Sequence, residues 1–144
     1  MTGDDVSWRA SRALFDGQGL MATLGAELVQ ARPGHVEIVL PVRPEVGQQH
    51  GFAHAGAVTS VLDTASGCAA ATLLPEGSEV LSIDFTVHLP RPALGERIRA
   101  VAEVVNAGRK VTFVRAEAYA ERADGSSKLC ALMTASMATT PASS

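Results

Sequence analysis

Hydrophobic and polar residues alternate along four stretches in the second half of the chain. In residues 81–89, for example, leucine, isoleucine, phenylalanine and valine occupy every second position. Alternation with a period of two predicts a strand that turns one side toward a core. Residues 97–106, 110–121 and 128–138 show the same pattern, and turn-forming dipeptides such as Asp124-Gly125 separate neighbouring stretches. The second half of the chain therefore predicts four consecutive strands of an antiparallel sheet.

The first half of the chain predicts a helical segment followed by a hairpin. Residues 8–24 have the pattern of one or two short helices, broken at Gly17 and Gly19. Residues 26–30 and 35–40 are predicted strands, because a Pro-Gly turn separates them and the second one alternates. The apolar face of that second strand consists of Val36, Ile38, Leu40 and Val42.

An alanine-rich segment from His54 to Leu74 predicts one long helix, which Pro75 and Gly77 end. Its apolar stripe at helical spacing consists of Val58, Val61, Leu62, Ala65, Ala69 and Leu73. Small residues occupy most of its other faces, which indicates a helix surrounded by protein. The order of elements predicts the α+β class, with an antiparallel sheet wrapped around this helix.

The length and composition of the chain narrow its class further. A chain of 144 residues suits one domain over residues 1–144, and we expect flexible ends at about 1–9 and 139–144. A net charge of -3 argues against nucleic-acid binding. No stretch reaches the about 18 apolar residues of a membrane span, and the first residues lack a signal-peptide pattern. The two cysteines are predicted to be reduced and buried, and a cytoplasmic location is expected.

Asp63 is the only formal charge between His54 and Leu74. On a helical wheel it lies off the apolar stripe, so it could face solvent and keep the helix soluble. The residues around it on the wheel are small and uncharged, however, which permits close approach of a ligand or a second backbone. These neighbours are Thr59, Ser60, Ser66, Gly67 and Ala70. In the second interpretation Asp63 is a candidate general base or nucleophile.

The start of the same helix supplies a second candidate group. Backbone N–H groups around Ala55 and Gly56 lack acceptors within the helix and carry partial positive charge, so they can polarise a carbonyl. Ala55 and Asp63 are eight residues apart, which is about 12 Å along a helix. One carbonyl cannot contact both groups of one helix. If the two groups cooperate, a second copy of the chain must supply one of them, through antiparallel pairing about a two-fold axis.

A metal site is a weaker possibility. His50 and His54 are four residues apart, a spacing that suits metal ligands on a helix. The residues between them have a loop-like composition, and the sequence contains neither an HExxH motif nor a cysteine cluster. We therefore expect no metal.

Two segments of this region resemble the signature of PaaI-like acyl-CoA thioesterases, which have the hotdog fold. They are Gln48-x-x-Gly51-x-x-His54-Ala55-Gly56 and Asp63-Thr64-Ala65-Ser66-Gly67. Residues 81–85, the Arg91-Pro92 pair and the Gly108-Arg109-Lys110 turn are similar to that family as well, and the resemblance covers about residues 10–138.

The resemblance implies hydrolysis of acyl-CoA to free acid and CoA, at a site shared between the subunits of a homodimer or, favoured by the resemblance, a homotetramer. Asp63 would be the nucleophile or general base, and the N–H of Ala55 would polarise the thioester carbonyl. Gln48 would orient water or substrate, Ser82 would assist near the carboxylate, and His54 is the motif histidine. The substrate-binding residues would be Gly56, Arg91, Arg109 and Lys110, the last three as partners for phosphates. No cofactor is implied, because CoA is part of the substrate.

One departure from the family concerns Ala55, where glycine is usual. A backbone donor tolerates alanine if φ is negative, but the methyl group could narrow the substrate channel.

The sequence does not determine the acyl group of the substrate, which could be an aryl-acetyl, a hydroxybenzoyl or a medium-chain fatty acyl group. Two other functions remain as alternatives: a hotdog acyl-CoA hydratase or dehydratase, which usually pairs the aspartate with a histidine further along the segment, and a non-catalytic acyl-CoA-binding module. No histidine follows Asp63 before His88.

Overall fold

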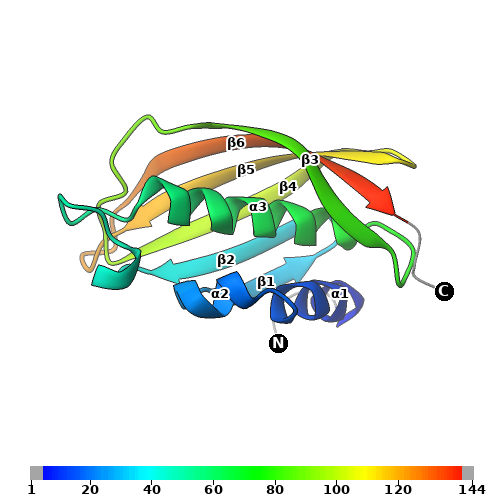
Figure 1. The fold of residues 1–144 in the computed structure, drawn as a ribbon, viewed down its shortest axis with the longest axis horizontal. Helices are drawn as coiled ribbons and strands as arrows, with labels where there is room; N and C mark the ends of the chain where they lie inside the picture. Colours follow the sequence, from blue (N-terminus) through cyan, green and yellow to red (C-terminus); the bar gives the residue numbers. More distant parts are fainter. Residues whose placement is uncertain (1–4, 141–144) are drawn as a thin grey trace.

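A computed structural model describes residues 5–140 of the chain (Figure 1). Its helices and strands are, in chain order, α1 (Asp5–Asp16), α2 (Gly19–Leu24), β1 (Glu27–Arg32), β2 (His35–Pro41), the short 3₁₀ helix η1 (Pro44–Val46), α3 (Ala55–Ala71), β3 (Glu79–His88), β4 (Arg97–Ala107), β5 (Val111–Glu121) and β6 (Ser127–Thr140). These elements confirm the predicted order of a helical segment, two strands, one long helix and four strands.

All six strands form one antiparallel sheet in the order β1-β2-β4-β5-β6-β3. The helix α3 lies along one face of this sheet and packs against every strand from β2 to β6, while α1 packs against α3 and β1 (Figure 1). The predicted α+β architecture, a sheet wrapped around one long helix, is therefore confirmed. The helical segment is interrupted at Gly17, between α1 and α2, as the sequence predicts.

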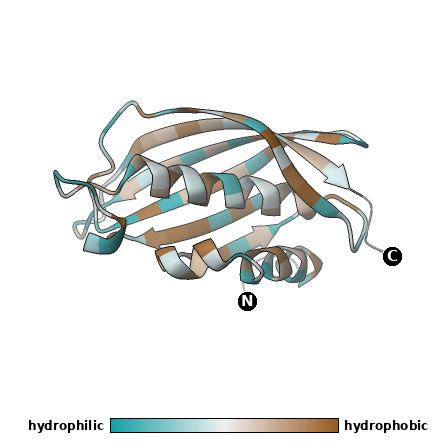
Figure 2. Cartoon of the chain, in the orientation of Figure 1, coloured by the Kyte–Doolittle hydropathy of each residue, from teal (hydrophilic) through white to brown (hydrophobic). Residues whose placement is uncertain are grey.

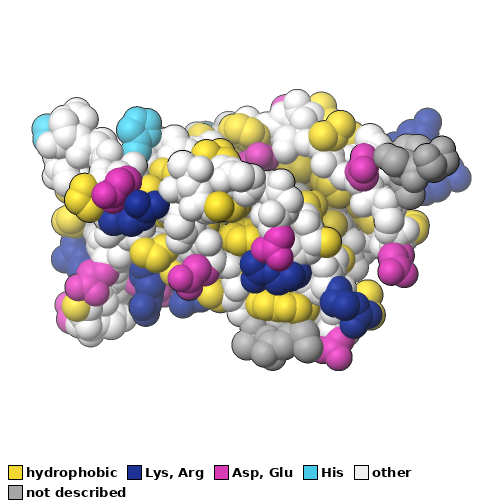
Figure 3. All heavy atoms as spheres, turned by 60° about the horizontal axis from the view of Figure 1, so that its bottom comes forward, with side chains coloured by type: hydrophobic (Ala, Val, Ile, Leu, Met, Phe, Trp, Pro, Cys, Tyr) yellow, Lys and Arg dark blue, Asp and Glu magenta, His cyan; other side chains and the backbone are white. Residues whose placement is uncertain are grey.

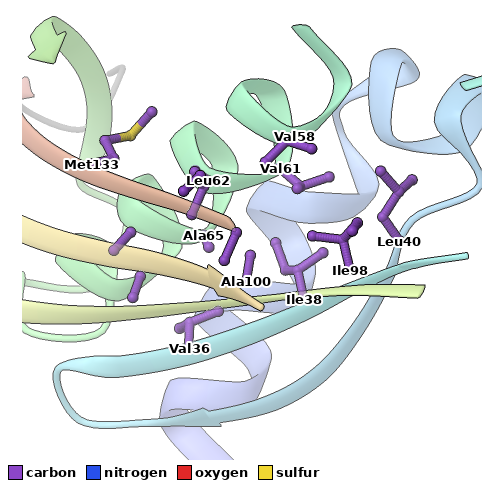
Figure 4. Close-up of a cluster of buried hydrophobic side chains, with 14 of the residues drawn as sticks. Val36, Ile38, Leu40, Val58, Val61, Leu62, Ala65, Ile98, Ala100 and Met133 are labelled. Atoms are coloured by element: carbon purple, nitrogen blue, oxygen red, sulfur yellow. The ribbon is translucent and has the colours of Figure 1, made fainter. Parts of the chain in front are cut away.

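The core lies between α3 and the inner face of the sheet (Figure 4). Brown and pale bands alternate along the strands in Figure 2, as the period-two pattern requires. On β5 every second residue from Thr112 to Ala120 is buried, and on β4 the buried positions are Ile98, Ala100 and Ala102. Many of these side chains are alanine, and α3 meets them with Ala65 and Ala69. Small residues on both sides bring the helix backbone close to the sheet.

The predicted helix from His54 to Leu74 is too long. α3 ends at Ala71, and the hydroxyl of Thr72 donates to the carbonyl of Ala69 at 2.6 Å and accepts the N–H of Gly34 at 2.8 Å. The following residues form tighter bonds to the third residue back, so Leu73 leaves the helical path. Leu73 is 42% exposed, and its assignment to the buried stripe is wrong; the other five residues of that stripe are buried.

The flexible ends predicted at residues 1–9 and 139–144 lie partly outside the described residues. Residues 5–9 form the first part of α1, and residues 139–140 are the end of β6.

Among the strands of residues 5–140, β3 lies at one edge of the sheet and pairs with β6 alone. Its alternation correctly predicts a strand, but the expected buried side is missing. Leu81, Ile83 and Phe85 are 63%, 55% and 43% exposed. A bulge between Ser82 and Asp84 shifts the register, so that Ser82 and Phe85 both lie opposite buried residues of β6 and share the side that faces α3. A ten-residue edge strand with large apolar side chains is an unprotected surface.

The outer face of the sheet carries charged residues. The guanidinium of Arg99 donates to Glu37 and Glu121, and Arg97 donates to Glu121 at 2.6 Å. Burial alone would raise the pKa of Glu121, but the hydrogen bonds from Arg97 and Arg99 outweigh it and lower this pKa. His35 lies between Glu37 and Glu103 and is buried by them. The two faces of the sheet thus differ sharply, since the opposite face is the apolar core.

Both cysteines are free and buried, as their spacing predicts. Burial raises the pKa of the Cys68 thiol to about 12 and also raises the pKa of Cys130. Burial therefore keeps Cys68 in the thiol form at pH 8, whereas the thiolate is the reactive form.

We expect both thiols to resist iodoacetamide at pH 8 in the folded protein and to react fully in guanidinium chloride. Mass spectrometry of the labelled protein measures the fraction modified in each condition. Rapid labelling of Cys68 in the folded protein would contradict the burial.

Candidate active site

The start of α3 leaves one backbone donor free. His54 is the N-cap residue, and its Nδ1 accepts the N–H of Gly56 at 2.8 Å. The carbonyl of His54 accepts the N–H groups of Ala57 and Val58. Among residues 5–140, the exposed N–H of Ala55 alone has no acceptor in the first turn of α3. The helix start therefore presents a single donor with partial positive charge, at the residue that the sequence predicts.

Ala55 has a negative φ, as have all non-glycine residues that the structure describes. The backbone condition for alanine at this helix start, a negative φ, is therefore met. The next residue has less freedom, because a Cβ on Gly56 would lie 3.0 Å from Nδ1 of His54. Glycine at position 56 thus leaves room for the capping ring.

Gln48 shapes the loop that precedes α3. Its side-chain Oε1 accepts the N–H groups of His50 and Phe52, and its backbone N–H donates to the carbonyl of Phe52 at 2.9 Å. His54 is tied to this loop because its N–H donates to the carbonyl of Val46 at 2.8 Å. Gln48 therefore fixes the approach to the helix start, and its amide nitrogen is the part left to contact water or substrate.

Asp63 lies in the middle of α3 and is half-buried. The hydroxyl of Ser82 on β3 donates to its Oδ1 at 2.6 Å, and the same hydroxyl lies 3.4 Å from the sulfur of Met137. No Lys, Arg or His between residues 5 and 140 forms an ion pair with Asp63. One carboxylate oxygen is thus fixed and the other is available, which suits a base or nucleophile better than a merely solubilising charge.

The chain brings the predicted residues together in two groups rather than one. Asp63 and Ser82 form the first, and Gln48, His54, Ala55 and Gly56 form the second, around the helix start. Both groups include residues of α3, and the eight-residue spacing from Ala55 to Asp63 separates them by about 12 Å.

The predicted cations are also divided between the two ends of the molecule. Arg91 donates to the carbonyl of Leu129 at 3.1 Å and lies near the start of α3, where Ala53 bonds to Ala93. Arg109 and Lys110 are exposed in the β4–β5 turn. The carbonyl of Lys110 accepts the N–H of Thr139, which is paired with the start of β3 (Figure 1).

A glycine fixes the geometry of that β4–β5 turn. A Cβ on Gly108 would lie 2.4 Å from the carbonyl oxygen of Val111. The backbone can therefore close this tight turn, which presents Arg109 and Lys110 to solvent, only at a residue without a side chain.

Within the described residues, no three His, Cys, Asp or Glu side chains are grouped as a metal site. None of the helices in that part of the chain has the length and hydropathy of a membrane-spanning helix.

Sequence reasoning missed Met137 and Phe85, which lie on the same side of the sheet as Ser82. The alternation along β3 places Ser82 and Phe85 on opposite faces, and only the bulge brings them to one face. No local signal marks this bulge, because it depends on pairing with a strand about 50 residues later in the chain.

Comparison with known proteins identifies the relatives of this chain. The model of the family described as "Thioesterase superfamily" matches residues 50–125. A protein of Halobacterium salinarum, whose name describes it provisionally as an esterase, is 33% identical over 118 residues, which is 77% of this chain and 78% of that protein. The crystal structure of a thioesterase family protein from Silicibacter pomeroyi is 44% identical, covers 92% of this chain and 97% of its own, and has a TM-score of 0.89.

The E. coli PaaI protein, from the phenylacetic acid degradation operon, has a TM-score of 0.83 at 19% identity, with 96% of both chains covered. This likeness shows the fold alone. Together with the thioesterase structure from S. pomeroyi, it confirms the predicted hotdog fold.

The capping bond of His54 leads to a test of its role. We expect His54→Ala to lower the free energy of unfolding by about 1 kcal/mol, because the N–H of Gly56 loses its acceptor. His54→Asn should recover most of this loss, since asparagine is among the best N-cap residues. Urea denaturation followed by circular dichroism measures both variants. Equal destabilisation by alanine and asparagine would contradict the capping role.

Proposed function

Because the chain belongs to the thioesterase superfamily, we propose that it hydrolyses acyl-CoA thioesters to a free acid and CoA, at sites that two subunits share. Family membership supports a hydrolase that acts on thioesters in general. The choice of substrate and the role of each residue are inferred from the site. The proposal rests on two groups of α3. The N–H of Ala55 at the helix start has no acceptor, and the carboxylate of Asp63, eight residues later, accepts a hydrogen bond from Ser82.

In this proposal the thioester carbonyl of the substrate accepts the N–H of Ala55. The carbonyl carbon then faces Asp63 of the partner subunit. The N–H stabilises the negative charge that develops on the carbonyl oxygen when a nucleophile adds to the carbon. Because the first-turn donors at Gly56, Ala57 and Val58 are already bonded, the oxyanion would lie against one defined N–H.

Asp63 can supply the nucleophile in two ways. Its free oxygen can add to the carbonyl carbon, expel CoA thiolate and leave an anhydride that water cleaves. Alternatively, it can take a proton from a water molecule while the water oxygen adds to that carbon. In both routes the C–S bond breaks and the thiolate of CoA takes up a proton. The hydrogen bond from Ser82 holds the carboxylate in one orientation for either route.

The exposed edge of β3 supports the pairing of two subunits. If two β3 strands pair antiparallel about a two-fold axis, their free edges and apolar side chains are covered together. The same axis relates the two α3 helices in opposite directions, which brings the start of each toward the middle of the other. The tetramer that the resemblance favours remains a prediction.

The positions of the cations agree with this arrangement. Arg91 lies at the end of the molecule where α3 begins, whereas Arg109 and Lys110 lie at the other end. Antiparallel pairing would bring Arg91 of one subunit toward the end that carries Arg109 and Lys110 of the other. Phosphates of CoA would then meet cations from both chains.

We expect Asp63→Ala and Asp63→Asn to lower kcat by about 10³-fold or more, because both remove the base or nucleophile. A free-thiol reagent measures CoA release over a panel of acyl-CoA esters, and urea denaturation checks folding. Glu27→Gln is the matched control, since it removes an exposed carboxylate of β1, at the edge of the sheet opposite β3. Turnover of Asp63→Ala near that of the wild type would rule out this role.

The same assays distinguish the two alternative functions. If the wild type binds acyl-CoA without turnover, a binding module is favoured, and if it adds water to an enoyl-CoA, a hydratase is favoured.

Replacement of Ala55 by proline tests the shared site. Proline is favoured at the first position of a helix, and the φ and ψ of His54, -63° and 136°, suit the residue before a proline. Ala55→Pro should therefore fold normally but lose the N–H donor, and kcat should fall about 10²- to 10³-fold. Ala55→Gly keeps the N–H and serves as the control.

Mixed dimers then separate a shared site from a site within one chain. In a dimer of one Ala55→Pro chain and one Asp63→Ala chain, one shared site has lost both groups and the other is intact. Unfolding and refolding an equal mixture should restore about a quarter of wild-type activity, since half of the dimers are mixed and each has one working site. A mixture that stays as inactive as its parents would contradict the shared site.

A further inference from the structure

Among residues 5–140, the carboxylate of Asp63 has one side-chain partner, the hydroxyl of Ser82. Several other carboxylates are paired with arginine, as Asp16 is with Arg12. Figure 3 shows acidic side chains beside basic ones on one face of the molecule. Asp63 forms no such pair within the described residues. Its orientation therefore follows the position of a single hydroxyl.

That hydroxyl lies on an edge strand, where little holds it. Ser82 is exposed, so water can compete for its hydroxyl, and a serine Oγ has three staggered positions. The hydroxyl carries one hydrogen, which it donates to Oδ1 of Asp63 at 2.6 Å. If Oγ turned away, or if the hydrogen went to another acceptor, Asp63 would lose this bond. A neighbour that fixes Ser82 would therefore act on the reaction without contacting the substrate.

Met137 of β6 is such a neighbour. It lies directly opposite Ser82 in the β3–β6 pairing, and its sulfur is 3.4 Å from the serine Oγ. Met137 is only 1% exposed, so its side chain cannot move aside into solvent. A thioether sulfur is a weak acceptor, whereas a carboxylate is a strong one. The sulfur thus limits where Oγ can lie and leaves its hydrogen to Asp63.

Thr112 lies on the other side of Met137. It is opposite Met137 in the β5–β6 pairing, so Ser82, Met137 and Thr112 form a row across three strands on the inner face of the sheet. Thr112 is fully buried, and its Oγ1 has no hydrogen-bond partner in the part of the chain that the structure describes. Met137 therefore fills the space between two hydroxyls. A smaller side chain would let a water molecule enter and bond to both, because polar groups hold water in buried cavities.

We propose that Met137 is a positioning residue for thioester hydrolysis, which keeps the Ser82 hydroxyl on Asp63 by excluding other partners from the buried side. This inference rests on the proposed function of Asp63. Two properties of the side chain matter: its length fills the space next to Thr112, and its low polarity leaves the hydrogen of Ser82 to the carboxylate. Because Met137 is buried, it acts on kcat rather than on KM.

Met137→Gln tests the polarity of this position. The amide oxygen of glutamine is a stronger acceptor than sulfur and should take the hydrogen of Ser82. We expect kcat for acyl-CoA hydrolysis to fall about tenfold or more, while KM stays within about twofold of the wild type. Met137→Leu fills the same space without polarity and should keep kcat within about threefold. Free-thiol release measures both constants.

Met133 provides the matched control. It is buried on the same face of β6 but lies opposite Val87, four residues from Met137 along the strand. Met133→Gln places the same amide in the core away from Ser82. Measured on the folded protein, it should leave kcat within about threefold of the wild type.

A double-mutant cycle separates positioning from general damage to the core. In Ser82→Ala the hydroxyl is gone, so adding Met137→Gln should have no further effect on kcat. A loss of equal size with and without the hydroxyl, or an equal loss in Met133→Gln, would overturn the inference. Ser82→Ala with the kcat of the wild type would overturn it as well, and would leave the role of Asp63 standing.

Met137→Ala keeps the inference testable if Met137→Gln does not fold. It admits water between Ser82 and Thr112, so kcat should fall about tenfold. Adding Thr112→Val removes the second partner of that water and should raise kcat again by about threefold or more. A kcat that stays low in the double variant would count against the role of Met137.

A crystal structure of Met137→Gln tests the positioning without any turnover. The Oγ of Ser82 should lie within hydrogen-bond distance of the new amide oxygen and no longer bond to Asp63. An unchanged bond between Ser82 and Asp63 would contradict the inference. If the wild type cleaves no acyl-CoA ester, the proposed function fails, and this crystal structure still decides whether Met137 holds Ser82 in place.

Discussion

The close packing of one alanine-rich helix on an alanine-lined sheet is the interaction on which the rest of this structure depends. The buried residues of β4 and β5 that face α3 are mostly alanine, and α3 meets the sheet with the five buried residues of its apolar stripe, Val58, Val61, Leu62, Ala65 and Ala69. The alanines let the two surfaces approach closely, and dispersion contacts there add to the packing of the larger side chains, such as Leu62 and Ile98. The same choice of residues leaves α3 without bulky side chains on the faces that the sheet does not cover. A helix of this kind can therefore form the wall of a site along its whole length.

Much of this fold could be predicted from the sequence because its signals are local. Alternation along β2, β4, β5 and β6, the alanine-rich helix and the intervening turns each depend on residues that are near one another in the chain. The errors occurred where distant parts of the chain decide. Leu73 leaves the helix because Thr72 is bonded to Gly34, and the large side chains of β3 stay exposed because none of the strands among residues 5–140 lies beyond it. Contacts between residues far apart in the chain produce no pattern in a short window of sequence, so they could not be predicted.

The candidate site could likewise be predicted only in part. Asp63 is recognisable as an isolated charge among small residues, and Ala55 as a donor at a helix start. The family resemblance already implies that Ser82 lies near the carboxylate, but its hydrogen bond to Asp63 and the capping role of His54 required the structure, since both depend on side-chain positions. The capping bond also determines which N–H of the helix start can bind a substrate. It occupies the N–H of Gly56, so the donor at Ala55 is singled out by elimination within the first turn.

The pairing of β3 with β6 has a consequence for the order in which the protein forms during synthesis. β3 is made in the middle of the chain, but its partner β6 comprises residues 127–140. Synthesis proceeds from the N-terminus at about 5–20 residues per second, so β3 waits for several seconds without its neighbour. The hydrogen bond from Ser82 to Asp63 can form only after this interval, because pairing with β6 holds Ser82 in place. A nascent chain therefore has a complete helix α3 before β6 can hold Ser82 beside the carboxylate of Asp63.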